Sequence, residues 1–167
     1  KDRVCAAIKN SGFISPKTRN QKVVVSLAPA ELKKEGPVFD LSVAMAYLLA
    51  SKQIFFEPEG KIFLGELALD GKIRPIKGVL SLVKNAKSLG FEEIFLPKAN
   101  AKEAALIDGI KIFACEKLED ITNHFDKENP VVLERQPKTE IDFDNFQSEI
   151  LFDFSDIKGQ ETAKRGL

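Results

Sequence analysis

The residue types that most often carry chemistry are sparse in this 167-residue chain. Cys5 and Cys115 stand far apart without CxxC spacing, and His124 is the one histidine available to join them. A structural zinc site needs about four such ligands close together, so we predict no metal site. We expect both cysteines to be buried as small apolar side chains in a reducing cytoplasm. His124, near a predicted helix end, is most simply a partner of the helix dipole.

One glycine-containing stretch, residues 65–73, has part of the pattern of a phosphate-binding loop. Five residues separate Gly65 from Gly71, one more than that loop has, and Ile73 stands where a Ser or Thr would hold magnesium. The stretch also has the pattern of a hairpin, whereas a phosphate-binding loop joins a strand to a helix. No other phosphate-loop or dinucleotide-binding motif occurs in the sequence. We therefore predict that this chain by itself holds no ATP and hydrolyses none.

Basic residues give the one hint of a direct binding role. Lys72, Arg74 and Lys77 cluster around the predicted hairpin, and Lys33 and Lys34 lie in an earlier loop. Lys plus Arg equal Asp plus Glu, 25 each, so any contact with nucleic acid needs a local patch of this kind. The patch is compatible with contact to DNA phosphates, with contact to another subunit, and with a solvated face. No aromatic residues for base stacking are interleaved with it.

Helical and strand signals alternate through the elements that must position these residues. Apolar spacing and helix-end residues predict helices at residues 4–11, 41–51, 78–89, 101–106 and 118–125. Short β-branched or aromatic runs predict strands at residues 22–27, 61–69, 72–75, 93–96 and 111–114. Asp40 is expected to cap the second helix, and Asp70-Gly71 predicts a hairpin. This order predicts an α/β or α+β domain with a mixed sheet.

Composition divides the chain into a domain at residues 1–128, a linker at residues 129–152 and a final segment at residues 153–167. Prolines and a polar, acidic stretch interrupt the periodicity in the linker, although its scattered apolar residues favour packing on a neighbouring surface. The chain begins mid-helix without Met, so we expect the domain to lack its natural start. No run of about 18 apolar residues and no signal region occur, which favours a cytoplasmic protein without a membrane partner.

Three sequence blocks together resemble the proteolytic domain of Lon and its relatives. They are Lys-Glu-Gly-Pro at residues 34–37, Leu-Gly-Glu-Leu-Ala-Leu-Asp-Gly-Lys-Ile-Arg-Pro-Ile-Lys-Gly at residues 64–78, and Ile-Phe-Leu-Pro-Lys-Ala-Asn at residues 94–100. Within that superfamily, Val-Ser-Leu-Ala-Pro-Ala at residues 25–30 and Phe-Asp-Leu at residues 39–41 look closest to the ComM/YifB branch, with RadA more distant. The resemblance implies a fold like ribosomal protein S5 domain 2.

The same resemblance identifies where a Lon-type Ser-Lys dyad would lie. The nucleophile follows Gly-Pro, and Val38 occupies that position. The general-base lysine lies four residues after the glycine at Gly78, and that residue is Leu82. Neither side chain can attack a carbonyl or accept a proton, so the resemblance implies no catalytic residues. Ser42 lies one helical turn too late and has no oriented base.

Residues 154–167 resemble the opening segment of AAA+ modules of the magnesium chelatase class. In those modules an Ile-x-Gly-Gln pattern, here Ile157, Gly159 and Gln160, lies against the adenine of ATP. The resemblance implies ATP and Mg²⁺ as cofactors of an intact protein, with the phosphate-binding motif beyond Leu167. A capped amphipathic helix is the simpler interpretation of the same residues.

Three functions from different classes follow. The resemblance implies a non-catalytic accessory domain of an AAA+ DNA motor, since ComM-like proteins are associated with ATP-driven branch migration in natural transformation. Its partners would be its own AAA+ domain, the neighbouring subunits of a homo-hexameric ring, and DNA. The alternatives are a Lon-like ATP-dependent peptidase with an atypical nucleophile and a subunit-interaction module of a chelatase complex.

Overall fold

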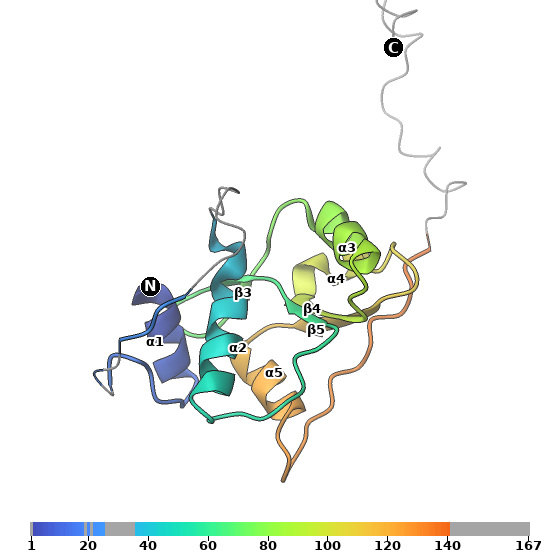
Figure 1. Ribbon diagram of the computed structural model, residues 1–167. Coiled ribbons are helices and arrows are strands. Elements are labelled where there is room, and N and C mark those ends of the chain that lie inside the picture. The colour runs from blue at the N-terminus through green and yellow to red at the C-terminus, as the bar shows by residue number, and fades with distance from the viewer. Residues whose placement is uncertain (1, 19, 21, 26–35, 141–167) are drawn as a thin grey trace, which may run out of the picture.

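The computed structural model describes residues 2–18, 20, 22–25 and 36–140. The described chain contains five α-helices, one short 3-10 helix and five short strands in two sheets (Figure 1). No helix in these ranges is long and apolar enough to cross a membrane. The expected α/β class is confirmed.

A three-stranded parallel sheet forms the centre of the fold. Its strands are β1 (Lys61–Phe63), β4 (Glu93–Pro97) and β5 (Lys111–Cys115), in the order β1-β4-β5. The register places Phe63, Phe95 and Phe113 side by side across the sheet, and their neighbours Ile62, Ile94 and Ile112 form a second row. Because successive strand side chains point to opposite faces, one face is aromatic and the other is aliphatic.

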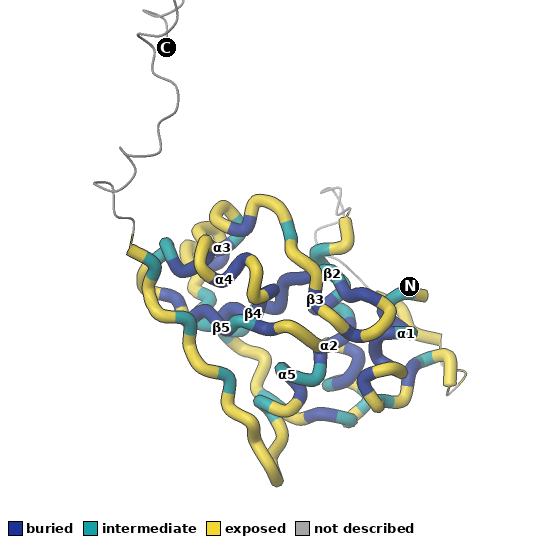
Figure 2. The backbone as a smooth tube through the Cα atoms, turned by 180° about the vertical axis from the view of Figure 1, so that it is seen from behind, coloured by how far each residue is buried: buried dark blue, intermediate teal, exposed yellow. Residues whose placement is uncertain are grey.

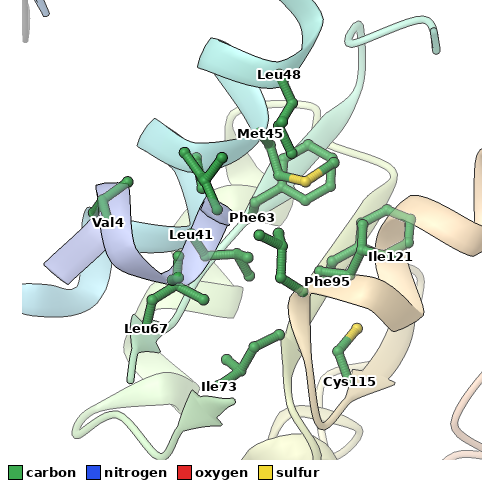
Figure 3. Packing of buried hydrophobic residues seen from close by; sticks show 14 of the residues in the cluster. Val4, Leu41, Met45, Leu48, Phe63, Leu67, Ile73, Phe95, Cys115 and Ile121 are labelled. Atoms are coloured by element: carbon green, nitrogen blue, oxygen red, sulfur yellow. The ribbon is translucent and has the colours of Figure 1, made fainter. Parts of the chain in front are cut away.

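The aromatic face is covered by three helices. They are α1 (Asp2–Asn10), α2 (Asp40–Ala50) and α5 (Leu118–His124), and their buried side chains share one core cluster with the phenylalanine row. Phe95 stacks between Phe63 and Phe113, with ring centroids 5.0 and 4.8 Å away. Figure 3 shows Met45 and Leu48 of α2 reaching toward Phe63 in this core. These three helices are held against the sheet because their apolar sides pack on its aromatic face.

The aliphatic face is covered by α3 (Val79–Ser88) and α4 (Lys98–Ala104). The inner side of α3 is formed by Val79, Val83 and Ala86, which are buried against the isoleucine row. Helices therefore cover both faces of a parallel sheet, as in other α/β domains.

The hairpin forms a second, separate sheet. Strands β2 (Glu66–Leu67) and β3 (Ile73–Arg74) pair antiparallel, and Asp70-Gly71 lies in the connecting turn, so the predicted hairpin is confirmed. Gly71 has φ +84°, and a β-carbon there would lie 2.6 Å from Oγ of Ser11, so only glycine fits the turn without displacement. The expectation of one mixed sheet is wrong, because the parallel and antiparallel strands lie in different sheets.

The predicted strand at residues 61–69 is two strands. Gly65, with φ +158°, separates β1 from β2 and sends the chain from one sheet to the other. Its N–H donates to the carbonyl of Val38 at 2.9 Å, and its carbonyl accepts from Leu41 at 3.1 Å. A β-carbon on Gly65 would lie 2.5 Å from Cγ2 of Ile73, so the break depends on glycine.

Three further expectations need correction. The described residues of the predicted strand 22–27, residues 22–25, have no strand assignment, because a β-branched run becomes a strand only when it has a neighbour to pair with. Helix α4 begins at Lys98 instead of residue 101, since Pro97 ends β4 and serves as its N-cap. Asp40 is the first residue of α2 and makes no cap; its carboxylate binds Arg3 at 2.7 Å instead. The other helices predicted before residue 129 agree with the structure within a few residues.

Residues 130–140, hereafter the strap, run back along the domain surface after α5 (Figure 1). Along the strap, Val131 donates to the carbonyl of Asn123 at 3.0 Å, and Gln136 donates to that of Ile112 at 2.8 Å. At its far end, Thr139 donates to the carbonyl of Ala105 at 3.1 Å. The described part of the predicted linker therefore lies against β5 and the end of α4.

Candidate functional site

The two positions that a Lon-type dyad would occupy lie on two different helical elements. Val38 lies in the 3-10 helix η1 (Pro37–Phe39) before α2, and Leu82 lies on α3. Both are half-buried and pack against the same apolar cluster, which includes Leu64 and Ile94. The bond from Gly65 to the Val38 carbonyl holds this part of η1 in place. Where a dyad would need a hydroxyl beside an amine, the structure has two aliphatic side chains in an apolar contact region.

Ser42 is the serine nearest to Val38 in sequence. It is half-buried on α2, and its hydroxyl donates to the carbonyl of Phe63. The lysines near Leu82 in sequence, Lys77 and Lys84, are both exposed. The Ser42 hydroxyl therefore joins α2 to β1 and is oriented toward a main-chain acceptor.

The loop that leads into α3 is held by one buried amide. Asn100, which is 7% exposed, accepts a 2.9 Å hydrogen bond from the N–H of Ile76 and donates a 3.0 Å bond to the carbonyl of the same residue. Asn100 lies on α4, so it fixes the start of α3 relative to its neighbouring helix. Gly78, with φ +70°, then turns the chain into α3.

The basic residues predicted around the hairpin are partly neutralised. Nζ of Lys72 lies 3.2 Å from a carboxylate oxygen of Asp70, and Nη1 of Arg74 lies 3.5 Å from Oε1 of Glu66. Hydrogen bonds from Lys72 hold the pKa of Asp70 below its usual value. Lys77 is exposed and has no ion pair with a described residue. Lys33 and Lys34 lie outside the described residues.

Glu66 also lies 3.5 Å from Arg3, whose guanidinium binds Asp40 at the start of α2. This chain of ion pairs joins α1, α2 and the hairpin. The sequence offered no direct signal for it, because the partners are separated by 37 and more residues.

The cysteines are both free and buried, as predicted. Burial raises the pKa of the Cys115 thiol to about 12, so the thiol stays protonated near neutral pH and is a poor nucleophile. No group of three or more His, Cys, Asp or Glu side chains that could hold a metal occurs within the described residues.

His124, predicted as a partner of the helix dipole, makes a specific contact with the strap. The N–H of Leu133 in the strap donates to its Nδ1 at 3.0 Å, and its ring packs near Phe95 and Phe113. Burial lowers the pKa of the imidazole, which favours the neutral form that can accept this bond. His124 is also the basic residue in the last turn of α5, where the sequence predicted a dipole partner, and the bond from the strap is an interaction that the sequence did not predict.

A hollow of about 670 Å³ lies elsewhere, between α1, α2 and residues 22–25. Val4, Ile8, Val43 and Tyr47 are among the side chains that line it. The sequence analysis did not predict this hollow. The one sequence feature that could have indicated it is the predominantly apolar surface of α2. Val38 and Leu82 do not line it. The adenine-side residues Ile157, Gly159 and Gln160 lie outside the described residues.

The fold and the site together define an α/β domain in which aliphatic side chains occupy both positions of a Lon-type Ser-Lys dyad. A family model described as Subunit ChlI of Mg-chelatase matches residues 1–100. The chain is 36% identical to the uncharacterized protein YifB of Escherichia coli K12, over 100% of this chain and 31% of that protein. It is 34% identical to the competence protein ComM of Haemophilus influenzae, over 99% of this chain and 32% of that protein.

A DNA repair protein, RadA of Aquifex aeolicus, is 35% identical over 62% of this chain and 22% of its own length. The chain belongs to the ChlI family of magnesium-chelatase subunits and is of the ComM/YifB type. It spans between 22% and 32% of the length of these relatives.

Proposed function

We propose that this chain is the non-catalytic amino-terminal accessory domain of a magnesium-chelatase-related AAA+ ATPase, with the fold of a Lon-like, S5-domain-2-like domain. The observation that carries the proposal is the packing of Val38 and Leu82 against one apolar cluster. Proton transfer and nucleophilic attack both need polar groups within hydrogen-bond reach, and these positions supply none. The domain then serves the intact protein by contacts and not by chemistry.

The intact protein in this proposal is an ATP-driven DNA motor for branch migration in natural transformation. Support comes from the names of two relatives, a competence protein and a DNA repair protein. ATP and Mg²⁺ are its cofactors, and Ile157, Gly159 and Gln160 supply the adenine side of the nucleotide site. The domain contacts its own AAA+ domain and neighbouring subunits of a homo-oligomeric ring in the cytoplasm.

A second candidate is a subunit-interaction module of a chelatase complex, which the description of the matching family favours. The two candidates differ in the partner of the intact protein, DNA in one case and a porphyrin-metalating complex in the other. A Lon-like peptidase is a weaker alternative, because Ser42 donates its hydroxyl to the Phe63 carbonyl.

The test uses the full-length protein that carries this chain. We expect its ATP hydrolysis to rise when branched or single-stranded DNA is added, and to be unaffected by protoporphyrin with Mg²⁺. The 167-residue chain, which lacks a phosphate-binding loop, serves as the control and is expected to bind no fluorescent ATP analogue at micromolar concentrations. Hydrolysis that responds to porphyrin and not to DNA would favour the chelatase module and contradict the DNA motor.

A further inference from the structure

The charges along the chain are distributed unevenly around α3. Residues 71–91 contain five basic residues and no acidic residue, although the whole chain is neutral. Two of the five, Lys72 and Arg74, are paired with carboxylates of the hairpin. The other three are Lys77, just before α3, and Lys84 and Lys87 on it.

Lys84 and Lys87 lie on the exposed surface of α3, and Lys77 lies in the loop just before it. Lys84 and Lys87 are three residues apart on the helix and are therefore neighbours on its surface, while Lys77 is exposed before the N-cap residue Gly78. Ser81 and Ser88 are exposed on this surface as well, and Val79, Val83 and Ala86 fill the opposite side. Figure 2 shows that α3 is largely exposed away from the sheet. Together, α3 and the loop before it thus present a row of ammonium groups, here the α3 row, interspersed with hydroxyls.

Ion pairs with described residues do little to offset the charge of this row. Neither Lys77 nor Lys84 has an ion pair with a described residue, in contrast to the cations of the hairpin. Asp108 is the acidic group that interacts with Lys87, and its carboxylate is bound by Lys138 at 3.1 Å. The Asn100 amide holds Ile76, one residue before Lys77, so the row has a fixed start.

We infer that the exposed surface of α3 and the loop before it, with Lys77, Lys84 and Lys87, binds the phosphate backbone of duplex DNA. The inference rests on the proposed DNA motor and assigns the contact to α3 instead of the hairpin. Lysine, serine and asparagine side chains are typical donors to phosphates, whereas the cores of protein interfaces are depleted in lysine. A duplex carries one charge per about 1.7 Å of its axis, so a helix about 15 Å long spans roughly nine phosphates. The contact is independent of base sequence.

The test compares two triple variants of the full-length protein with the same loss of charge. One carries Lys77→Gln, Lys84→Gln and Lys87→Gln. The matched control carries Lys9→Gln, Lys52→Gln and Lys127→Gln, all exposed, on α1 and on the loops after α2 and α5. These elements lie at the other end of the domain from α3 (Figures 1 and 2). Fluorescence anisotropy with a labelled duplex measures affinity from 50 to 200 mM salt, and light scattering measures assembly.

We expect the α3 variant to bind every duplex more weakly and its salt slope to fall by about 2.7, which is about 0.9 for each lost phosphate contact. The control variant is expected to keep the wild-type slope. Unchanged DNA binding by the α3 variant, or equal losses in both variants, overturns the assignment to α3. Loss of assembly with unchanged DNA affinity also overturns it and makes α3 a subunit contact. Wild-type protein that binds no DNA at 50 mM salt would instead remove the proposed DNA motor itself.

Discussion

The main-chain N–H of Leu133 donates to Nδ1 of His124 at 3.0 Å, and this bond ties the strap to the end of α5. The bond requires an unprotonated Nδ1, and burial already lowers the pKa of the ring below its usual 6.5. Glu93 opposes this shift and Lys61 adds to it, each through its charge.

Acidification is therefore expected to destabilise the folded chain through His124. Because the folded-state pKa is lower than the unfolded one, the unfolded chain binds the proton first as pH falls below 6.5. The contribution to stability is complete above that value and is lost as pH falls through the folded pKa. Urea unfolding at pH 7.5 and at pH 5.5 measures the effect. His124→Gln, which keeps an acceptor without titrating, should show a smaller change; an equal change would contradict the assignment.

Phe95→Ala should be among the most destabilising single substitutions. Phe95 is fully buried, and its ring stacks on Phe63 and Phe113. The lost burial and the remaining cavity are expected to cost about 3–5 kcal/mol of unfolding free energy. Leu89→Ala is the control, since Leu89 is 76% exposed and should change stability by less than about 0.5 kcal/mol. Equal effects in the two variants would contradict the packing described for the aromatic face.

Asn100→Ala is expected to loosen the entry to α3. The substitution leaves the N–H and carbonyl of the half-buried Ile76 without their partner, at a cost of about 1 kcal/mol, the low end of the range for unsatisfied buried groups. Hydrogen exchange should accelerate at the Ile76 amide. Asn100→Asp keeps the acceptor for that amide, so exchange there should stay closer to wild type. Unchanged protection of Ile76 in Asn100→Ala would show that Asn100 does not hold the loop.

No peptidase activity is expected from this chain. Val38 and Leu82 lack polar atoms, and the Ser42 hydroxyl is bonded to the Phe63 carbonyl. Incubation with unfolded casein and with a serine-reactive phosphonate measures turnover and labelling. Ser42→Ala is the diagnostic control, because activity that disappears in this variant would establish Ser42 as a nucleophile and contradict the proposed non-catalytic role.

The sequence predicted those elements whose conformation depends mainly on a few neighbouring residues. Asp70-Gly71 predicted the hairpin, since the positive φ that the turn needs at Gly71 depends on little beyond the local sequence. The apolar spacing of residues 78–89 predicted α3 for the same reason. The strand at residues 22–27 was predicted from β-branched composition, but pairing depends on a partner that composition does not contain.

Relations between distant residues could not be predicted in this way. The strands at residues 93–96 and 111–114 were expected, but the alignment of Phe95 with Phe113 follows from register, which neither run encodes separately. The identities of Val38 and Leu82 could be read from the sequence through the Lon resemblance. Their packing against one cluster required the tertiary structure.

The strap determines where mechanical load enters the domain. Its last described main-chain bond joins Thr139 to Ala105, next to α4, and its first joins Val131 to Asn123 on α5. Tension applied to the chain after residue 140 would therefore reach the end of α4 first. The hydrogen bonds of the strap would then break one after another, in the order Thr139, Gln136, Leu133 and Val131. Such sequential release needs less force than breaking all four together, so the strap would detach from the domain surface in steps.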